Sequence, residues 1–287
     1  MPAPTFSSLV ATDWLAARLG RDDLVVLDVS WYLPTSGRDA RAEFRAGHIP
    51  GARFFDLDLA SDPRTTLPHM MPEAAAFAEY VSSLGVADDG PIVVYDGSGA
   101  NLSAARVWWM FRAFGHDAVA ILDGGMGKWR AEGRPVESGQ RPVAPRVFHA
   151  RLDRSWVWPL ERVAQALADG AAQVVDLRPA GRFEGTLPEP REGIPSGHMA
   201  GAINLPYSEL VRGDGTALSG EELRARLARA GLRLDRPVVA TCGSGTSACA
   251  LLFALHQLGA DAGALYDGSW TEWATRGMPV RVGPTGA

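Results

Sequence analysis

The fold is decided by the stretch PIVVYDGSG, residues 91–99, which occurs a second time as PVVATCGSG, residues 237–245. In each copy a short apolar run enters a glycine-rich segment, a pattern typical of a buried strand that ends in a tight loop. Three more motif pairs follow the same order in both halves: LDV at 27–29 and VDL at 175–177, HIPGA at 48–52 and HMAGA at 198–202, and LDGG at 122–125 and YDGS at 266–269. The offsets, 146 from Asp96 to Cys242 and 150 from His48 to His198, are nearly constant and indicate a duplicated domain.

Short apolar runs alternate with helical patterns in both halves. This alternation predicts an α/β fold of two tandem domains, each with a mainly parallel sheet flanked by helices. The expected strands are residues 24–29, 92–95, 119–122, 173–177, 238–241 and 264–266, and the expected helices are residues 72–85, 221–230 and 248–258. A Pro- and Arg-rich stretch predicts the boundary, with one domain over 1–140, another over 150–287 and a linker at about 133–150.

The composition argues against several classes of function. The chain has 287 residues and a net charge of -5, whereas a nucleic-acid binder would present a basic surface. No apolar stretch is long enough to cross a bilayer, so we expect no membrane partner. Residues 1–8 lack the segments of a signal peptide, and two cysteines provide no disulfide framework. Both observations favour a reducing, cytoplasmic location.

Cys242 has the surroundings of a reactive thiol. It follows a predicted buried strand and precedes a predicted helix, and ligands of parallel α/β folds gather where strands end and helices begin. Gly243 and Gly245 let the loop curl so that backbone N–H groups point inward, and such a nest stabilises an anion such as a thiolate. A free cysteine is more often a small buried hydrophobe. That alternative suits Cys249, which faces apolar neighbours on the predicted helix, while a redox role for it stays open.

Several motifs together resemble those of a known family. The loop 242–247, followed by residues 248–249, resembles the active-site loop of the 3-mercaptopyruvate sulfurtransferases, members of the tandem-rhodanese group. Similar motifs elsewhere are DLR at 176–178, GRF at 181–183, PEPR at 188–191, SGH at 196–198, RVWWMFR at 106–112 and YDGSW at 266–270. The similarity covers nearly the whole chain. It implies that Cys242 accepts a sulfur atom as a persulfide and that neither a metal nor an organic cofactor is needed.

The resemblance also implies a substrate site around Cys242. Arg182 and Arg191 match arginines that hold the substrate, and guanidinium groups suit a keto-carboxylate. They lie in the segment 179–197, which we expect to be an unusually long, functional loop. The remaining substrate-binding residues belong to the cysteine loop and are Gly243, Gly245, Thr246 and Ser247. The family usually has Val-Thr where this chain has Thr-Ser at 246–247, a change that leaves the loop shape intact but bears on affinity.

A proton relay follows from the same resemblance. Asp58 and His69 match an acidic residue and a histidine that approach the catalytic loop from the other domain, so Ser244, His69 and Asp58 are expected to form a hydrogen-bonded relay beside the thiol. Asp96 occupies in the first repeat the place of Cys242. A carboxylate cannot accept sulfur, so the first domain is expected to be catalytically silent. The repeated histidines at 48 and 198 are expected to be structural, with no metal site.

The residues after Cys242 bear on the sulfur donor. Gly243 and Ser244 are uncharged where thiosulfate sulfurtransferases carry basic residues, which favours 3-mercaptopyruvate, with its single carboxylate. The expected reaction releases pyruvate and passes the sulfur to cyanide, a thiol or a thioredoxin-like acceptor. A thiosulfate:cyanide sulfurtransferase (rhodanese) and a non-catalytic sulfur-relay module remain alternatives. A cysteine phosphatase is disfavoured, because Ala248 stands where such enzymes need an arginine.

Overall fold

The computed structural model describes residues 7–261 and 263–284 and divides into two compact units. Unit 1 contains the described residues through Pro63, together with Met71–Asp153 and Gly213–Ala217. Unit 2 contains Arg64–Met70, Arg154–Arg212 and the described residues from Leu218 onward. Each half of the sequence therefore contributes a short segment to the other unit. The expectation about a signal peptide in residues 1–8 falls largely outside the described residues.

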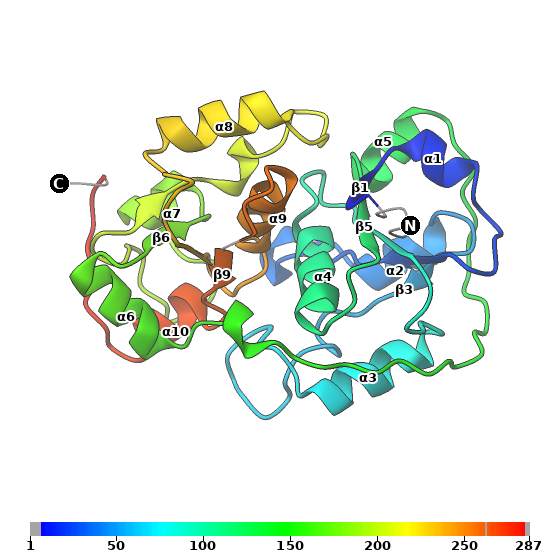
Figure 1. Ribbon diagram of the computed structural model, residues 1–287, viewed down its shortest axis with the longest axis horizontal. Helices are drawn as coiled ribbons and strands as arrows, with labels where there is room; N and C mark the ends of the chain where they lie inside the picture. The colour runs from blue at the N-terminus through cyan, green and yellow to red at the C-terminus, as the bar shows by residue number, and fades with distance from the viewer. Residues whose placement is uncertain (1–6, 262, 285–287) are drawn as a thin grey trace. The chain divides into compact units, whose positions relative to one another are not determined.

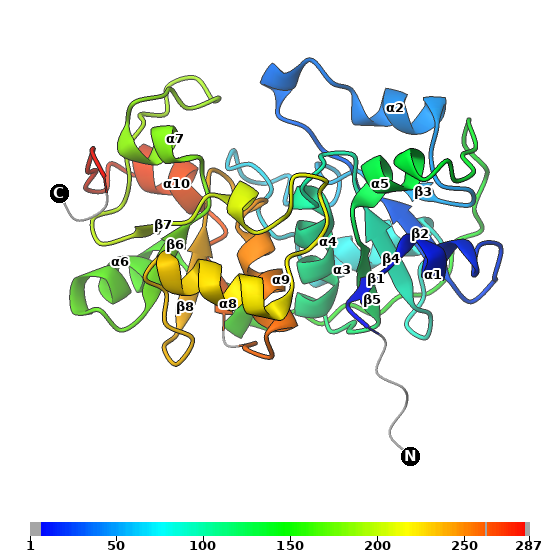
Figure 2. The same ribbon diagram turned by 90° about the horizontal axis from the view of Figure 1, so that it is seen from above.

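The sheet of unit 1 is entirely parallel, with its strands in the order β1-β5-β4-β2-β3. The strands are β1 (Leu9–Val10), β2 (Val25–Asp28), β3 (Arg53–Phe54), β4 (Ile92–Tyr95) and β5 (Val119–Leu122). Because side chains alternate along a strand, the buried apolar runs fill cores on both faces of the sheet. Figures 1 and 2 show helices on the two faces.

One face of this sheet packs against α1 (Thr12–Ala16), α2 (Ala40–Ala46) and α5 (Gly125–Ala131) in a single apolar core. On the other face, α4 (Leu102–Ala113) lies against β4 and β5. Helix α3 (Ala74–Ser83) packs beside α4 through Phe77, whose ring stacks on that of Phe114. A short 3-10 helix, η1 (Pro34–Ser36), precedes α2.

Unit 2 repeats this design with a four-stranded parallel sheet in the order β7-β6-β8-β9. Its strands are β6 (Gln173–Asp176), β7 (Ile203–Asn204), β8 (Val238–Thr241) and β9 (Gly263–Leu265). One core joins the sheet to α6 (Leu160–Asp169), α7 (Ala180–Glu184) and α10 (Ser269–Thr275). The other helical elements are α8 (Gly220–Arg229), α9 (Cys249–Gln257), which lies against β8 and β9, η2 (Arg154–Trp156) and η3 (Tyr207–Glu209).

The duplication extends to the two repeated histidines. His48 Nδ1 lies 2.7 Å from the carbonyl oxygen of Phe44, and His198 Nδ1 lies 3.0 Å from that of Phe183. Each imidazole stacks on the same phenylalanine that it contacts, with ring centroids 3.9 Å apart in both units. Both histidines are buried. These matched contacts fit the expectation that the pair is structural.

The predicted fold class is confirmed: the chain forms two α/β units with parallel sheets. All the predicted strands and helices are present, with ends within two residues of those expected. The short strands β1, β3 and β7 were not predicted, nor were the helices α1, α2, α4, α5, α6 and α10. One expectation is wrong, because the segment 179–197 is not a continuous loop: residues Ala180–Glu184 form α7. The predicted linker at 133–150 lies within a segment grouped with unit 1, so the domain boundaries stay a prediction.

Candidate functional site

The loop after β8 is fixed in place by the start of α10. Cys242 follows the last residue of β8 and is only 2% exposed. Its carbonyl oxygen accepts a hydrogen bond from the Trp270 N–H at 2.9 Å. The Gly243 carbonyl accepts two bonds from Thr271, one from the N–H at 3.1 Å and one from Oγ1 at 2.6 Å. The loop carbonyls are thereby turned towards α10.

The carbonyl groups of Cys242 and Gly243 accept hydrogen bonds from α10, but several N–H groups of the same loop are not bonded in this way. Within the described part of the chain, the N–H groups of Ser244, Thr246 and Ser247 donate to no protein acceptor. They lie between Cys242 and the first residue of α9, where backbone donors and the helix dipole both favour negative charge. Successive N–H groups of this kind form an anion-binding nest. The loop therefore offers its donors to a negatively charged group next to the thiol.

His69 contacts two hydroxyl groups of the cysteine loop. Its Nδ1 lies 3.0 Å from Ser244 Oγ and 3.0 Å from Thr246 Oγ1. The contact with Ser244 was expected, whereas the contact with Thr246 was not. His69 is 4% exposed and has a φ of 61°, a left-handed conformation that is uncommon outside glycine. Non-glycine residues with such backbone conformations are concentrated at functional sites.

The third member of the expected relay lies in unit 1. Asp58 accepts a hydrogen bond from Trp31 Nε1 at 3.2 Å, whereas His69 belongs to the segment Arg64–Met70 of unit 2. The described contacts thus join Ser244 to His69 within one unit. The participation of Asp58 in a relay stays a prediction.

Two arginines lie over the cysteine loop. A Cβ atom placed on Gly243 would be 3.0 Å from Arg182 Nη2 and 3.7 Å from Arg191 Nη1. Glycine at this position lets both guanidinium groups approach the backbone next to Cys242. Arg191 also donates from Nη2 to Ser244 Oγ at 3.3 Å. The structure therefore brings both predicted arginines to the residue that follows the thiol.

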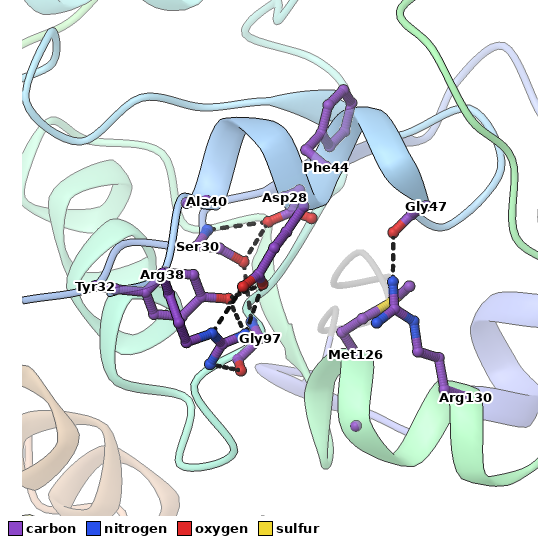
Figure 3. A pocket seen from close by; sticks show the side chains of 12 residues that line it. Asp28, Ser30, Tyr32, Arg38, Ala40, Phe44, Gly47, Gly97, Met126 and Arg130 are labelled. Atoms are coloured by element: carbon purple, nitrogen blue, oxygen red, sulfur yellow. Dashed lines mark hydrogen bonds and ion pairs between the residues drawn. The ribbon is translucent and has the colours of Figure 1, made fainter. Parts of the chain in front are cut away.

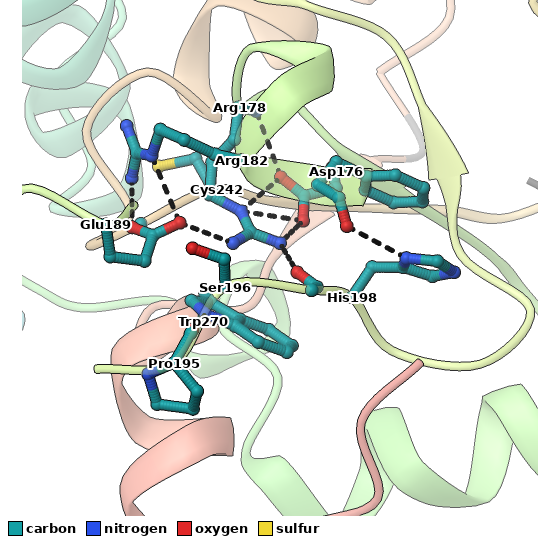
Figure 4. A network of polar contacts seen from close by, with 12 residues as sticks. Asp176, Arg178, Arg182, Glu189, Pro195, Ser196, His198, Cys242 and Trp270 are labelled. Atoms are coloured by element: carbon teal, nitrogen blue, oxygen red, sulfur yellow. Dashed lines mark hydrogen bonds and ion pairs between the residues drawn. The ribbon is translucent and has the colours of Figure 1, made fainter. Parts of the chain in front are cut away.

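Arg182 is part of a chain of ion pairs that sequence reasoning missed (Figure 4). Glu189 accepts hydrogen bonds from Arg182 and, at 2.7 Å, from Arg178 Nη1. Arg178 in turn binds both carboxylate oxygens of Asp176, at the end of β6. Burial alone would lower the pKa of the Arg178 guanidinium, but the adjacent Asp176 and Glu189 raise it. In the sequence, Glu189 belongs to the motif PEPR at 188–191, which gave no indication that it pairs with Arg178 and Arg182.

Gly245, another residue predicted to bind substrate, lies in the cysteine loop at 242–247. Gly245 has a φ of 77° and accepts a hydrogen bond from Cys249 Sγ at 3.4 Å through its carbonyl. Cys249 is fully buried at the start of α9, as expected for a core residue.

Among the described residues, no group of three or more His, Cys, Asp or Glu side chains is arranged to hold a metal ion. No described helix is both long and apolar enough to cross a membrane.

The corresponding loop of unit 1 is occupied by its own side chain. The Asp96 carboxylate accepts hydrogen bonds from the Ser98 N–H at 2.8 Å and the Ser98 hydroxyl at 2.6 Å. It also accepts from the Ser103 hydroxyl at 3.1 Å and the Ala104 N–H at 2.9 Å. Asp96 is 1% exposed. Donors of the loop and of the first turn of α4 are therefore used by an internal anion.

Comparison with known proteins agrees with this geometry. The family model of the rhodanese-like domain matches residues 11–132 and 160–276. Over 288 residues the chain is 46% identical to the 3-mercaptopyruvate sulfurtransferase of Rattus norvegicus, covering 98% of this chain and 97% of the relative. It is 43% identical over 280 residues to the thiosulfate sulfurtransferase of Bos taurus, covering 96% and 94%. The crystal structure of SseA from Escherichia coli, a 3-mercaptopyruvate sulfotransferase, superposes with a TM-score of 0.84 at 36% identity, covering 92% and 99%.

Proposed function

The chain belongs to the family of rhodanese-like domain proteins, and from this premise we propose that it is a sulfurtransferase that takes sulfur from 3-mercaptopyruvate onto Cys242. The observation that carries the proposal is the loop of unit 2. A buried thiol is followed by three N–H groups that have no acceptor in the described part of the chain, and two arginines cover the loop. These groups suit a sulfur anion and a carboxylate, respectively.

The reaction proceeds in two steps. The Cys242 thiolate attacks the sulfur of 3-mercaptopyruvate, so that a sulfur–sulfur bond forms and the carbon–sulfur bond breaks. The bonding electrons leave with carbon as the enolate of pyruvate, which takes up the proton of the donor thiol. An acceptor thiolate or cyanide then attacks the outer sulfur and regenerates the Cys242 thiolate. In this proposal the N–H groups of Ser244, Thr246 and Ser247 stabilise the anionic persulfide between the two steps, and their lack of an acceptor among the described residues supports that role.

The two arginines act on the donor in this proposal. Arg191 and Arg182 bind the carboxylate and polarise the keto group of 3-mercaptopyruvate, which makes the enolate a better leaving group. Glu189 limits the positive charge of Arg182 and holds its guanidinium beside Gly243. Gly243, Gly245, Thr246 and Ser247 shape the rest of the substrate site. A donor with one carboxylate suits this arrangement better than dianionic thiosulfate.

Protons are managed by Ser244 and His69. Their contact at 3.0 Å supports a role for the imidazole in moving the proton of the donor thiol towards the enolate. Asp58 is proposed to complete the relay. Apart from Asp58, unit 1, which has Asp96 in place of the cysteine, takes no part in the chemistry. The proposed acceptors are cyanide, small thiols and thioredoxin-like proteins, and the proposed location is the cytoplasm.

The proposal is tested by the mass of the protein after reaction. Incubation with 3-mercaptopyruvate, without an acceptor, is expected to add one sulfur atom to Cys242 and to release one pyruvate per chain. The Cys249→Ser variant should gain the same sulfur, whereas Cys242→Ser should not. Absence of added sulfur on the wild-type chain would favour a non-catalytic relay module. A kcat/KM for thiosulfate above that for 3-mercaptopyruvate would instead favour the thiosulfate:cyanide activity.

A further inference from the structure

Unit 1 contains a pocket at the position that corresponds to the cysteine site of unit 2. It has a volume of about 100 Å³ and lies beyond the ends of β2 and β4 (Figure 3). In the strand order β1-β5-β4-β2-β3, the chain leaves β2 for β3 on one side and returns to β4 on the other. Ligands of parallel α/β sheets bind at such a switch point. The place of the pocket in the fold therefore favours a ligand.

Part of the pocket wall neutralises its own charge. Arg38 donates to both carboxylate oxygens of Glu43, to the Tyr32 hydroxyl at 2.7 Å and to the Gly97 carbonyl at 3.0 Å. Its Nε, Nη1 and Nη2 nitrogens all have partners. Figure 3 shows the contacts of Arg38 with Tyr32 and Gly97. The paired charges of Arg38 and Glu43 leave no net charge for a ligand to meet.

Two further charged groups, Asp28 and Arg130, line the pocket and form no ion pair among the described residues, although Arg130 is close enough to Glu43 to help lower the pKa of its carboxyl. Asp28, at the end of β2, accepts hydrogen bonds on Oδ1 from the N–H and the hydroxyl of Ser30, and its carboxylate is also hydrogen-bonded to the Tyr95 side chain. Arg130, on α5, donates from Nη2 to the Gly47 carbonyl at 2.8 Å, which uses one of the five N–H donors of a guanidinium. In the described part of the chain neither side chain forms an ion pair. The pocket thus presents one anion and one cation, each with capacity for another partner.

We propose that this pocket binds a small zwitterion of the α-amino acid class, with its ammonium group at Asp28 and its carboxylate at Arg130. A molecule with both charges supplies a counterion to each side chain, whereas a simple anion or a simple cation supplies only one. The volume restricts the ligand to a few heavy atoms, and Phe44 and Met126 provide apolar contacts for a short side chain. Burial raises the pKa of the Asp28 carboxyl to about 6, so it is ionised at neutral pH at a cost that an ammonium group offsets.

The test uses L-alanine as the probe and the full-length Cys242→Ser chain as the protein. This variant cannot transfer sulfur, so the result does not depend on the function proposed for unit 2. Calorimetry at pH 7.5 is expected to detect binding of L-alanine at least about tenfold tighter than that of propionate or ethylammonium. Equal binding of propionate would overturn the zwitterion assignment, and absence of L-alanine binding at millimolar concentration would overturn the site.

Substitutions then locate the ligand. Asp28→Asn and Arg130→Gln should each weaken L-alanine binding by about tenfold or more, because each removes one charge-assisted contact. Arg130→Lys keeps the charge and should retain part of the affinity, which separates loss of binding from loss of folding. Arg41→Gln, which removes a surface ion pair with Asp56, is the matched control and should bind normally. Unchanged binding in both pocket variants, with melting temperatures near that of the parent, would place the ligand elsewhere and overturn the proposal.

Discussion

The loop after β4 in unit 1 and the loop after β8 in unit 2 have nearly the same sequence, DGSG at 96–99 and CGSG at 242–245, but they use their donors differently. In unit 1 the Asp96 carboxylate binds the N–H groups of Ser98 and Ala104. In unit 2 the N–H of Ser244, the counterpart of Ser98, has no acceptor among the described residues. The same backbone design therefore binds its own carboxyl side chain in one unit and leaves its donors for an external group in the other.

The two units also differ at the strand next to this loop, β2 in unit 1 and β6 in unit 2. Asp28 at the end of β2 has Ser30 as its neighbour, whereas Asp176 at the end of β6 has Arg178. The Asp176–Arg178 pair continues through Glu189 to Arg182 and so reaches the cysteine loop. Unit 1 has no equivalent continuation from Asp28 among its described ion pairs. A buried carboxylate thus connects to Arg182, which is proposed to bind substrate, in one unit and lines a separate pocket in the other.

The largest expected effect comes from making the second loop resemble the first. In Cys242→Asp, the new carboxylate should accept the Ser244 N–H as Asp96 accepts the Ser98 N–H, while the nucleophile is lost. Sulfur transfer from 3-mercaptopyruvate should fall by about a thousandfold or more, measured as pyruvate release. The melting temperature should change little.

The reciprocal variant completes this comparison. Asp96→Cys should gain no sulfur, because Arg38, the arginine over Gly97, already binds Glu43 through Nε and Nη2 and the Gly97 carbonyl through Nη1. Mass spectrometry of the double variant Asp96→Cys, Cys242→Ser after incubation with 3-mercaptopyruvate shows whether residue 96 carries an added sulfur atom. A persulfide on residue 96 would contradict the view that the arginines, and not the loop alone, make a site competent.

A smaller effect is expected at Glu189. Glu189→Gln leaves the buried Arg178 and the adjacent Arg182 short of one negative charge, and breaking a buried ion pair costs about 3 kcal/mol. We expect a corresponding loss of stability of unit 2 in hydrogen exchange of the β6 and β8 amides, together with a lower kcat/KM. The exposed pair Arg233–Asp235 provides the control, since Asp235→Asn should change stability by less than about 1 kcal/mol. A Glu189→Gln chain as stable as this control would show that the arginines do not depend on Glu189.

The smallest effect concerns pH and Asp28. Burial raises the pKa of its carboxyl from 3.8 to about 6, so the folded state binds the proton more tightly than the unfolded state. The stability that protonated Asp28 contributes is fully present below pH 3.8 and is lost as the pH rises through 6. It amounts to about 3 kcal/mol at most.

Asp28→Asn isolates this contribution. The free energy of unfolding of unit 1 is compared between the wild-type chain and this variant. The value for the wild-type chain minus that for the variant should decrease between pH 4 and pH 7. Hydrogen exchange of the β2 and β4 amides at several pH values measures it within one unit. A difference that is constant over this range would mean that Asp28 titrates at its ordinary pKa.

Much of the fold could be predicted because the same local sequence patterns occur in the same order in both halves of the chain. Apolar runs such as 92–95 and 238–241 are buried on both faces of a parallel sheet, so their composition alone marks them as strands. β1, β3 and β7 have two residues each, too few for any periodicity to appear. Helix α7 was missed because a single turn between proline and glycine has the composition of a loop.

The site was predictable where a residue acts through its own chemistry. Cys242 and its glycines could be identified from their place between strand and helix, and the arginines from a family resemblance. Glu189 and the second hydroxyl contact of His69, with Thr246, depend on three-dimensional packing of segments that the sequence does not mark as neighbours. Ser103 and Cys249 are counterparts in the two repeats, seven residues after Asp96 and Cys242. Ser103 donates to the Asp96 carboxylate, whereas Cys249 donates to the Gly245 carbonyl.

The short segments exchanged between the halves of the sequence set a limit on how this protein can be divided. Residues 64–70 carry His69 into unit 2, and residues 213–217 join unit 1, where the Asn101 amide donates to the Gly215 carbonyl and Asp123 accepts the Ala217 N–H. Cutting the gene at the linker would give two fragments, each lacking a piece of its own unit. Recombination that swaps one half of the sequence for a foreign repeat would therefore have to restore both segments.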